Sequence, residues 1–289
     1  MAIKKVTRKS LDIKFSGRSS DYITPSFGFG CLFKCGYCYM RRHKPDGLDV
    51  ATNTRDIIVA IDNHLATLPE KEANQTHESL WTYDISCNED FALHAKHHDV
   101  DQIFDYFINY TDRAMATFAT KYVNKDLLKY NPKGKIRIRF SLMPQELADI
   151  LEPNTSSIVN RILAVNDFVK AGYDVHLNFS PVIFNEGTGR MYDKLFHQVE
   201  GLIEDEYKSK IKAEVILLTH NEKLHLHNLE QGLYSTEELL WQPERQRIKR
   251  SSYGPVNLRY NPKLKQMYER LFRELHDKII PWNTIRYMF

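Results

Sequence analysis

Three cysteines lie close together near the start of the chain, in the segment GFGCLFKCGYCYM. Cys31, Cys35 and Cys38 form a C-x3-C-x2-C array, and this spacing lets three thiolates converge on one small inorganic centre. A cubane iron–sulfur cluster has four irons, so three thiolates leave one iron without a protein ligand. That iron can bind a small molecule. The array therefore predicts a [4Fe–4S] cluster that takes part in chemistry.

A structural zinc site is the alternative for the same residues. His43 follows the last cysteine by five positions, so the three thiols and this histidine could complete a Cys3His shell. Structural zinc usually staples small domains, whereas this array follows the first predicted strand of a large one. Phe33, Tyr37 and Tyr39 interleave with the thiols, which suits a shielded redox centre. The sequence favours the cluster over zinc.

These cysteines must be positioned by a fold of alternating strands and helices. Six short runs rich in β-branched and aromatic residues are predicted strands: 21–27, 79–86, 114–122, 136–143, 173–183 and 213–219. Helices are predicted between them at 52–68, 100–109, 155–171 and 191–211. Thr155 or Asn154 is the predicted N-cap of the third helix, and Gly172 its stop. The alternation predicts an α/β fold, a partial (β/α)6 barrel of the TIM type.

Function in such a sheet gathers at the carboxyl ends of the strands. Polar or thiol residues follow the predicted ends here, at Cys31, 86–90, Lys121, Ser141, 178–180 and 220–221. After about residue 240 the chain becomes basic and turn-rich, and a final helix is predicted near 263–278. We therefore predict an N-terminal extension over 1–20, the barrel over 21–240, and a basic C-terminal appendage packed on it over 241–289.

Composition limits the possible classes of protein. The chain has 289 residues, 42% hydrophobic and 27% charged, which excludes disordered and fibrous classes. It has no apolar run long enough for a transmembrane helix and no secretory signal. Four cysteines, three of them clustered, are not a disulfide framework, so we expect a reducing cytoplasm and no membrane partner. The net charge of +3 means that any polyanion site is a local patch.

The cysteine array that opens a six-stranded barrel resembles the radical S-adenosylmethionine (SAM) superfamily, and the chain as a whole resembles the spore photoproduct lyase family. The resemblance runs from about Thr24 to the C-terminus. It is carried by the segments TPSFGFGCLFKCGYCY, TYDISCNED, FATKY, IRIRFSLMP, VHLNFSPVI, WQPERQ, YGPVNLRY and IPWNTIRYMF. An isolated cysteine after the second strand, Cys87, makes the likeness more specific than the array alone.

The resemblance implies roles for individual residues. Cys31, Cys35 and Cys38 match the cluster ligands, and the amino and carboxylate groups of SAM would chelate the fourth iron. Cys87 matches the cysteine that returns a hydrogen atom to the product radical. Tyr37 and Tyr39 match a tyrosine pair that takes part in radical or hydrogen transfer. The residues expected to contact the cofactor are Tyr37, Asn88, Lys121, Ser141 and Asn178. A flavodoxin or ferredoxin is the expected electron donor.

The implied reaction is hydrogen abstraction by a 5′-deoxyadenosyl radical from a thymine dimer in DNA, which cleaves the bond between the two thymines. Two features depart from the repair lyases. Only 30 residues precede Cys31, and Cys87 is followed by Asn88 and Glu89, where a hydroxyl residue is expected. These departures leave the cofactor chemistry unchanged and the substrate open. The alternative substrate is a hypermodified thymidine in viral DNA, which a radical SAM isomerase or modifying enzyme would alter. A zinc-stapled DNA-binding protein is the remote alternative.

A basic tail supplies the predicted DNA contacts. Its cations are interleaved with Tyr253 and Tyr260, which suits phosphate contacts beside a displaced base. The predicted DNA-binding residues are Arg245, Arg247, Lys249, Arg250, Tyr253 and Arg259, with a turn at Tyr253 and Gly254. A solvated basic face is the alternative for this tail. The run HAKHHD, with His94, His97 and His98, is predicted to be a polar helix start in preference to a second metal site.

Overall fold

A parallel sheet is the centre of the computed structural model, which describes residues 2–185, 187–250 and 256–289. Its strand order is β14-β10-β9-β8-β7-β6-β3-β2. All neighbours from β3 to β14 pair in parallel, and β2 (Lys14–Phe15) pairs antiparallel with β3. The parallel strands are β3 (Tyr22–Ile23), β6 (Trp81–Asp84), β7 (Ala114–Thr120), β8 (Ile136–Leu142), β9 (Asp174–Val182), β10 (Lys212–Leu217) and β14 (Thr284–Met288).

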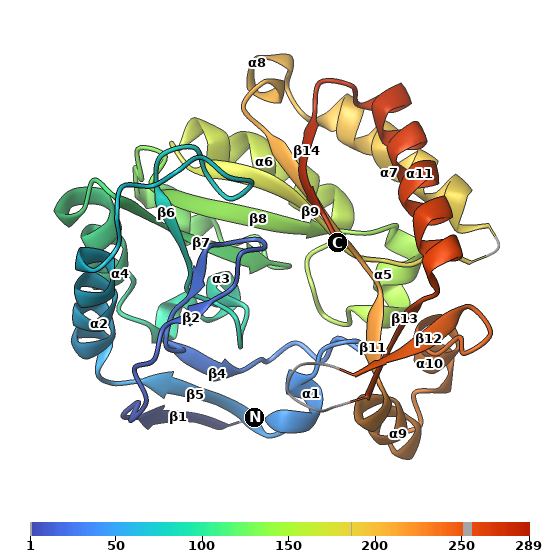
Figure 1. The fold of residues 1–289 in the computed structure, drawn as a ribbon, viewed down its shortest axis with the longest axis horizontal. Helices are drawn as coiled ribbons and strands as arrows, with labels where there is room; N and C mark the ends of the chain where they lie inside the picture. Colours follow the sequence, from blue (N-terminus) through green and yellow to red (C-terminus); the bar gives the residue numbers. More distant parts are fainter. Residues whose placement is uncertain (1, 186, 251–255) are drawn as a thin grey trace.

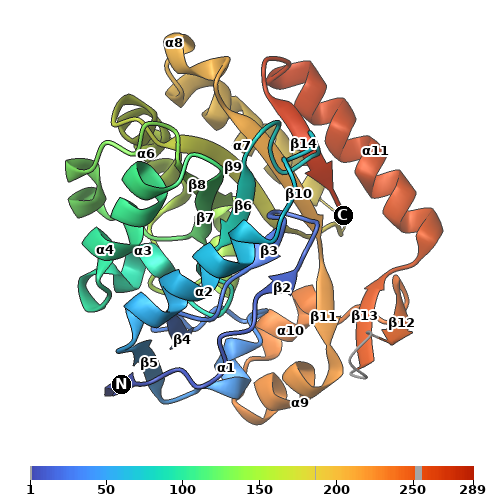
Figure 2. The same ribbon diagram turned by 60° about the vertical axis from the view of Figure 1, so that its left-hand side comes forward.

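The predicted partial barrel is confirmed. Each of the six predicted runs overlaps one strand of this sheet, and these strands follow one another in chain order. The sheet curls, and helices lie outside it (Figures 1 and 2). The sequence did not predict β14, which brings the last residues of the chain beside β10. The boundaries proposed at residues 20 and 240 stay predictions.

Helices cover the convex face of the sheet because each one presents an apolar stripe to it. The longer ones are α2 (Thr54–Ala66), α4 (Val100–Asp105) with the π-helical turn η2 (Tyr106–Tyr110), α6 (Ile158–Lys170), α7 (Thr188–Leu202) and α11 (Pro262–Ile279). In α6 the buried stripe includes Ile158, Ile162 and Val165. No helix of the described residues is both long and apolar enough to cross a membrane.

The predicted ends of α6 were half right. Gly172 follows the helix with φ +94°, as a stop residue should. The N-cap prediction was wrong, because Ser157 caps the helix by accepting a hydrogen bond from the amide of Asn160. Asn154 instead has a left-handed backbone (φ +63°) and turns the chain ahead of the helix.

Shorter elements build the rim of the barrel. The short helices are α1 (Met40–His43), α3 (Phe91–His94), η1 (Ala95–His97), η3 (Lys125–Lys129), α5 (Gln145–Leu151), α8 (Asp205–Lys208), α9 (Glu222–Glu230) and α10 (Tyr234–Leu240). One small sheet has the order β1-β5-β4, from β1 (Ala2–Val6), β5 (Gly47–Ala51) and β4 (Gly28–Gly30). A second has the order β11-β13-β12, from β11 (Thr219–Asn221), β13 (Val256–Tyr260) and β12 (Gln246–Arg250).

Buried charges cross the concave face of the main sheet. Arg139 on β8 reaches Asp84 on β6 (2.6 Å) and Glu214 on β10 (3.0 Å). These strands are separated by one strand on each side, so the contacts can form only across the inside of the curl. Arg286 on β14 joins the network at 2.8 Å from Glu214. Buried ion pairs therefore link strands that are not neighbours in the sheet across the inside of its curl.

Candidate active site

The cysteine array lies in a loop between β4 and α1. Cys35 is buried, and Cys31 and Cys38 are partly exposed; none forms a disulfide. The strand directly before the array is therefore β4, a strand of the side sheet, and not the first strand of the barrel as predicted. Gly30 permits this turn, since its φ is +117° and a Cβ there would lie 2.2 Å from the carbonyl oxygen of Gly47.

The spacing of the thiols fits a cluster better than a single zinc ion. Among the described residues, neither the three thiols nor the thiols with His43 bring three ligand atoms within 4.8 Å of one another. A zinc ion with bonds of about 2.3 Å to sulfur needs its ligands closer together than this. The thiolates of a cubane, each on a different iron, lie farther apart. The three thiols of the array therefore fit a [4Fe–4S] cluster with one open iron.

The thiols are protonated without a bound metal. Burial, with the charge of Asp90 as the second cause, raises the pKa of Cys31 to about 12. Burial also raises the pKa of Cys35, against the opposing charge of Lys121. Metal ligands must be thiolates, so loading this site releases protons.

Three side chains meet at the carboxyl ends of β7, β8 and β9, beside the loop. Lys121 Nζ lies 3.4 Å from Ser141 Oγ, which accepts a second hydrogen bond from Asn178 Nδ2 at 3.3 Å. The sheet register sets this contact, because Ser141 and Asn178 are paired across β8 and β9. Asn178 Oδ1 is buried without a partner among the described residues. The predicted cofactor contacts are thus brought together and leave polar groups available to a ligand.

Tyr37 contacts a buried ion pair that the sequence did not predict. Its hydroxyl donates a hydrogen bond to Glu152, whose carboxylate lies 2.8 Å from Arg161; both charged side chains are fully buried. Lys121 Nζ lies 5.6 Å from the centre of the Tyr37 ring. Burial and the Glu152 charge raise the pKa of Tyr37 well above its usual value, so the phenol stays protonated.

Tyr39 and Cys87 are neighbours in space although they lie far apart in sequence. The Tyr39 hydroxyl contacts Asn88 Oδ1 at 2.6 Å and the Cys87 carbonyl oxygen at 3.0 Å. Asn88 Nδ2 in turn donates to Ser26 Oγ. The Cys87 residue is exposed, but partial burial of its sulfur, with Asp84 second, raises its pKa to about 11. A protonated thiol next to a phenol can give up a hydrogen atom.

The histidine run serves the cysteine loop as a support. His94 and His98 contact one oxygen of the buried Glu89 carboxylate, at 2.9 and 2.8 Å. His94 Nε2 accepts a hydrogen bond from the amide of Leu32, next to the first cysteine. Glu89 also lies directly under Gly28, where a Cβ would meet the carboxylate at 2.2 Å. The run covers the last residue of α3, all of η1 and Asp99, whose side chain caps the start of α4, so it leads into a helix as predicted.

A cleft of about 830 Å³ opens between the cysteine loop and the β11-β13-β12 sheet. Its lining residues are Tyr37, Tyr39, Arg42, His43, Thr219, Asn221, Glu222, Lys223, Leu224, Val256 and Asn257. In both ribbon views α1 lies beside β11 and α9 (Figures 1 and 2). The two predicted tyrosines therefore face one entrance, and the basic hairpin of β12 and β13 forms part of its wall.

The hairpin arranges some of the predicted cations on one face. Arg247 and Arg259 are paired across β12 and β13, and Lys249 lies two residues along the same face. Arg245 is partly buried and lines a different groove. Tyr260 was wrongly expected beside a base, because it is 2% exposed and its hydroxyl accepts from the amide of Phe184.

The predicted turn residues, Tyr253 and Gly254, and the side chain of Arg250 lie outside the described part of the chain.

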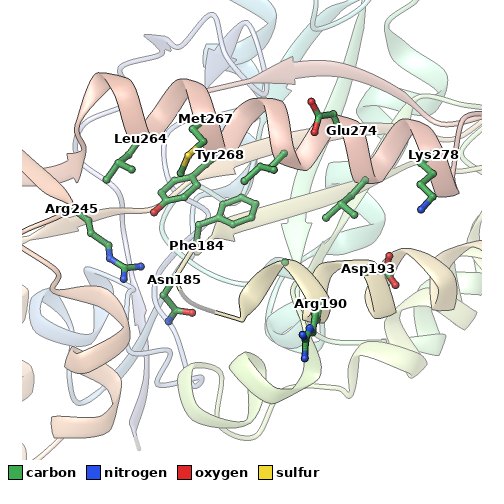
Figure 3. A pocket seen from close by; sticks show the side chains of 13 residues that line it. Phe184, Asn185, Arg190, Asp193, Arg245, Leu264, Met267, Tyr268, Glu274 and Lys278 are labelled. Carbon is green, nitrogen blue, oxygen red and sulfur yellow. The ribbon is translucent and has the colours of Figure 1, made fainter.

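A separate groove of about 1070 Å³ runs between α7 and α11, and no residue of the cysteine loop lines it (Figure 3). The Phe184 and Tyr268 rings stack in its wall with centroids 4.8 Å apart. Arg245 lies at one end and Lys278 at the other. Arg245 is the one predicted site residue that lines it, and none of its lining residues lines the cleft beside the cysteine loop, so the two are separate.

Sequence reasoning missed the buried partners of the site, chiefly Glu152, Arg161 and Arg139. Arg139 carries a detectable signal, because arginines alternate with apolar residues along β8 and must point into the curl. The pairing of Glu152 with Tyr37 spans 115 residues, and nothing local predicts it.

The chain is similar in sequence to a family of known enzymes. A family model described as "Spore photoproduct lyase" matches residues 3–289. The chain is 25% identical over 284 residues to the spore photoproduct lyase of Bacillus subtilis, which covers 97% of this chain and 80% of that protein. It is 24% identical over 285 residues to the one from a Geobacillus strain, with the same coverage.

Solved structures share the fold. A spore photoproduct lyase complexed with dinucleoside spore photoproduct superposes with a TM-score of 0.87 and 22% identity, over 99% of this chain and 82% of that one. A variant with bound AdoMet and dinucleoside spore photoproduct also gives a TM-score of 0.87, at 21% identity. The curled sheet described above is therefore the fold of these enzymes.

Proposed function

The chain belongs to the spore photoproduct lyase family, and from this membership we propose that it is a radical SAM lyase that cleaves a thymine dimer in DNA. The observation that carries the proposal is the convergence of the cysteine loop, the strand-end residues of β7–β9 and the Tyr39–Cys87 pair on one end of the barrel. Each part supplies what this reaction needs, and the sequence places the parts far apart.

The cysteine loop is the proposed cluster site. Cys31, Cys35 and Cys38 would hold a [4Fe–4S] cluster and leave one iron open for SAM. When bound, the reduced cluster supplies one electron to the SAM sulfonium, which yields the 5′-deoxyadenosyl radical that abstracts hydrogen from the substrate. Gly36 and Gly30 let the loop pack closely against its supports. Three free thiols also suit a reducing cytoplasm, where we expect this protein to work.

The strand-end residues are the proposed SAM contacts. Lys121 carries a positive charge beside Ser141 and Asn178, so it can bind the carboxylate of the cofactor's methionine part. The Glu152 charge raises the pKa of Lys121, against the opposing effect of burial, so the ammonium form persists at neutral pH. Asn88, held between Tyr39 and Ser26, can present its amide to the same ligand.

Cys87 and Tyr39 are the proposed hydrogen donors. After the dimer loses a hydrogen atom and its linking bond breaks, one thymine remains as a carbon radical. Cys87 can transfer the hydrogen atom of its thiol to that carbon, which leaves a thiyl radical on sulfur. The Tyr39 hydroxyl, 3.0 Å from the Cys87 carbonyl oxygen, can replace this hydrogen atom, which would leave the radical on Tyr39.

The hairpin of β12 and β13 is the proposed DNA contact, since Arg247, Lys249 and Arg259 lie on one face of it. A flavodoxin or ferredoxin is the proposed source of the electron. Arg41 and Arg42, next to the array on α1, are cations that such an acidic donor could contact.

One observation favours a second substrate class. Asn88 and Glu89 follow Cys87 where a hydroxyl residue is expected close by, and Glu89 turns away into a buried contact with His94 and His98. Neither residue supplies that hydroxyl, which supports a substrate other than the thymine dimer, such as a modified thymidine. A radical SAM isomerase acting on hypermodified DNA is the second candidate.

Product analysis separates the two candidates. Anaerobically reconstituted protein would be given SAM, dithionite and either a dinucleoside thymine dimer or thymidine-modified viral DNA. We expect conversion of the dimer to thymine monomers and an unchanged modified base. Conversion of the modified base with an intact dimer would assign the second candidate instead.

A further inference from the structure

A second group of potential metal ligands lies behind the active-site cleft. β11 carries Thr219 and Asn221 into the cleft, and the residue between them, His220, points the other way and is 1% exposed. There it meets His225 from α9 and Glu237 from α10. Among the described residues, these three form the one group of His, Cys, Asp or Glu side chains whose ligand atoms all lie within 4.8 Å of one another.

The group supplies three of the four ligands of a tetrahedral ion, which leaves the fourth position open to water. Glu237 Oε2 lies 3.0 Å from His220 Nε2 and 2.5 Å from His225 Nδ1. The ring of Trp241 stacks on His225 with centroids 4.1 Å apart and planes within 8°. Stacking fixes the orientation of the imidazole, so its nitrogen stays aimed at the carboxylate. Two imidazoles and one carboxylate from three separate elements are a common donor set for zinc.

The buried negative charge of Glu237 also favours a bound cation. Its side chain is only 3% exposed, and within the described part of the chain no lysine or arginine lies at ion-pair distance from it. A buried carboxylate needs a compensating positive charge. The two histidines supply one only if an imidazole is protonated, whereas a divalent cation supplies it with both imidazoles neutral.

The group is connected to the cysteine loop. Asn228 Nδ2 donates to Glu237 Oε1 at 2.5 Å and to the carbonyl oxygen of Gly36 at 2.8 Å. Thr236, the residue before Glu237, packs directly on Gly36. One change at Glu237 therefore reaches the backbone between Cys35 and Tyr37.

We propose that His220, His225 and Glu237 bind one divalent transition-metal ion of the zinc class, which braces the loop of the catalytic cysteines. The ion would replace the two imidazole protons that now point at the carboxylate. It would join β11, α9 and α10 into one rigid support for the cleft wall. This site is independent of the iron–sulfur cluster, and it does not rest on the proposed reaction.

The test uses the chain without its competing thiolates. In a variant with Cys31, Cys35 and Cys38 all changed to Ala, the added probe is Co²⁺, followed by its visible absorption and then displaced by Zn²⁺. We expect one Co²⁺ per chain, with a spectrum that lacks the charge-transfer bands of sulfur ligands. His225→Ala and Glu237→Gln in this background should weaken binding by more than about 100-fold, because each removes a direct ligand.

His227→Ala is the matched control. It removes an imidazole two residues away on the same helix, and His227 is not one of the three converging ligands. Its Co²⁺ affinity should equal that of the parent. Equal affinity in His225→Ala and Glu237→Gln, or no stoichiometric binding in the parent, would overturn the proposal. A sulfur charge-transfer band would assign the ion to Cys87 and overturn it as well.

A second measurement keeps the test valid if the cysteine variant fails to fold. The protein with all its cysteines is reconstituted anaerobically with iron, sulfide and zinc, and its metals are counted by mass spectrometry. We expect about four irons from the cluster and one additional metal ion that His225→Ala loses and His227→Ala keeps. The same additional ion in all three proteins would contradict the site.

Discussion

Gly36 is the position where the structure predicts the sharpest response to one added methyl group. A Cβ at this glycine would lie 2.3 Å from Cγ2 of Thr236, and real carbon pairs do not approach so closely. Thr236 is 5% exposed and β-branched, so it cannot easily rotate away. Overpacking of this kind costs about 1–3 kcal/mol. We expect Gly36→Ala to lower stability by that amount and to reduce the iron bound after reconstitution.

Thr236→Ser provides the matched rescue. It removes only Cγ2, after which the nearest Thr236 atoms to the added Cβ would be those now at 3.5 Å, an ordinary contact. As a single change, Thr236→Ser should lower the free energy of unfolding by about 0.5–1.5 kcal/mol, as for deletion of one buried methyl group. Combined with Gly36→Ala it should restore iron content and most of the stability.

Urea unfolding of the parent, the two single variants and the double variant gives the four free energies of unfolding for a double-mutant cycle, provided that the dependence of free energy on urea concentration is the same in all four. A coupling energy near zero, or a full iron content in Gly36→Ala alone, would refute the packing of α10 on the cysteine loop.

Three further predictions concern the proposed SAM contact, the proposed hydrogen donor and the basic hairpin. Lys121→Met should weaken SAM binding by about 10–100-fold, the worth of a hydrogen bond to a charged group, while the cluster remains; equilibrium dialysis with iron analysis checks both. In the variant that keeps Cys87 as its only cysteine, the rate of alkylation should rise with pH with a midpoint near 11, because the raised pKa keeps the thiol protonated at lower pH. A midpoint near 8.5 would show a fully solvated sulfur. Replacing Arg247, Lys249 and Arg259 by Ala should reduce the slope of log affinity against log salt for DNA binding by about 0.9 for each phosphate that the variant no longer neutralises. Replacing Lys212, the first residue of β10, and Lys210, two residues before it, should leave this slope unchanged.

The elements that the sequence predicted well are those whose pattern is local. Strands such as β8 and β9 are short, β-branched and followed by turn signals, so their existence and order could be inferred. β14 could not, because its five residues follow a long polar helix and find their partner, β10, only in the folded chain. The N-cap of α6 was misplaced because several polar residues in succession could each serve, and tertiary contacts decided between them.

The site divides in the same way. The three clustered cysteines could be identified from spacing alone, and the strand-end positions of Lys121 and Ser141 from the alternation of elements. The contact of Tyr39 with Cys87 and Asn88 spans 48 and 49 residues, so only the fold brings them together. The ion pair of Glu152 with Arg161 links α6 to the segment after α5, and its role under Tyr37 has no local sequence signal.

The most direct test of the proposed reaction is the fate of hydrogen in the product. The reconstituted protein would convert a dinucleoside thymine dimer in D2O with SAM and dithionite, and mass spectrometry would count deuterium in the released thymines. Because the Cys87 thiol exchanges with solvent, we expect one thymine to carry a single deuterium, and Cys87→Ala to abolish this normal labelled product while SAM is still cleaved. An intact dimer beside accumulating 5′-deoxyadenosine, or labelled thymine formed equally well by Cys87→Ala, would contradict dimer cleavage with Cys87 as the hydrogen donor.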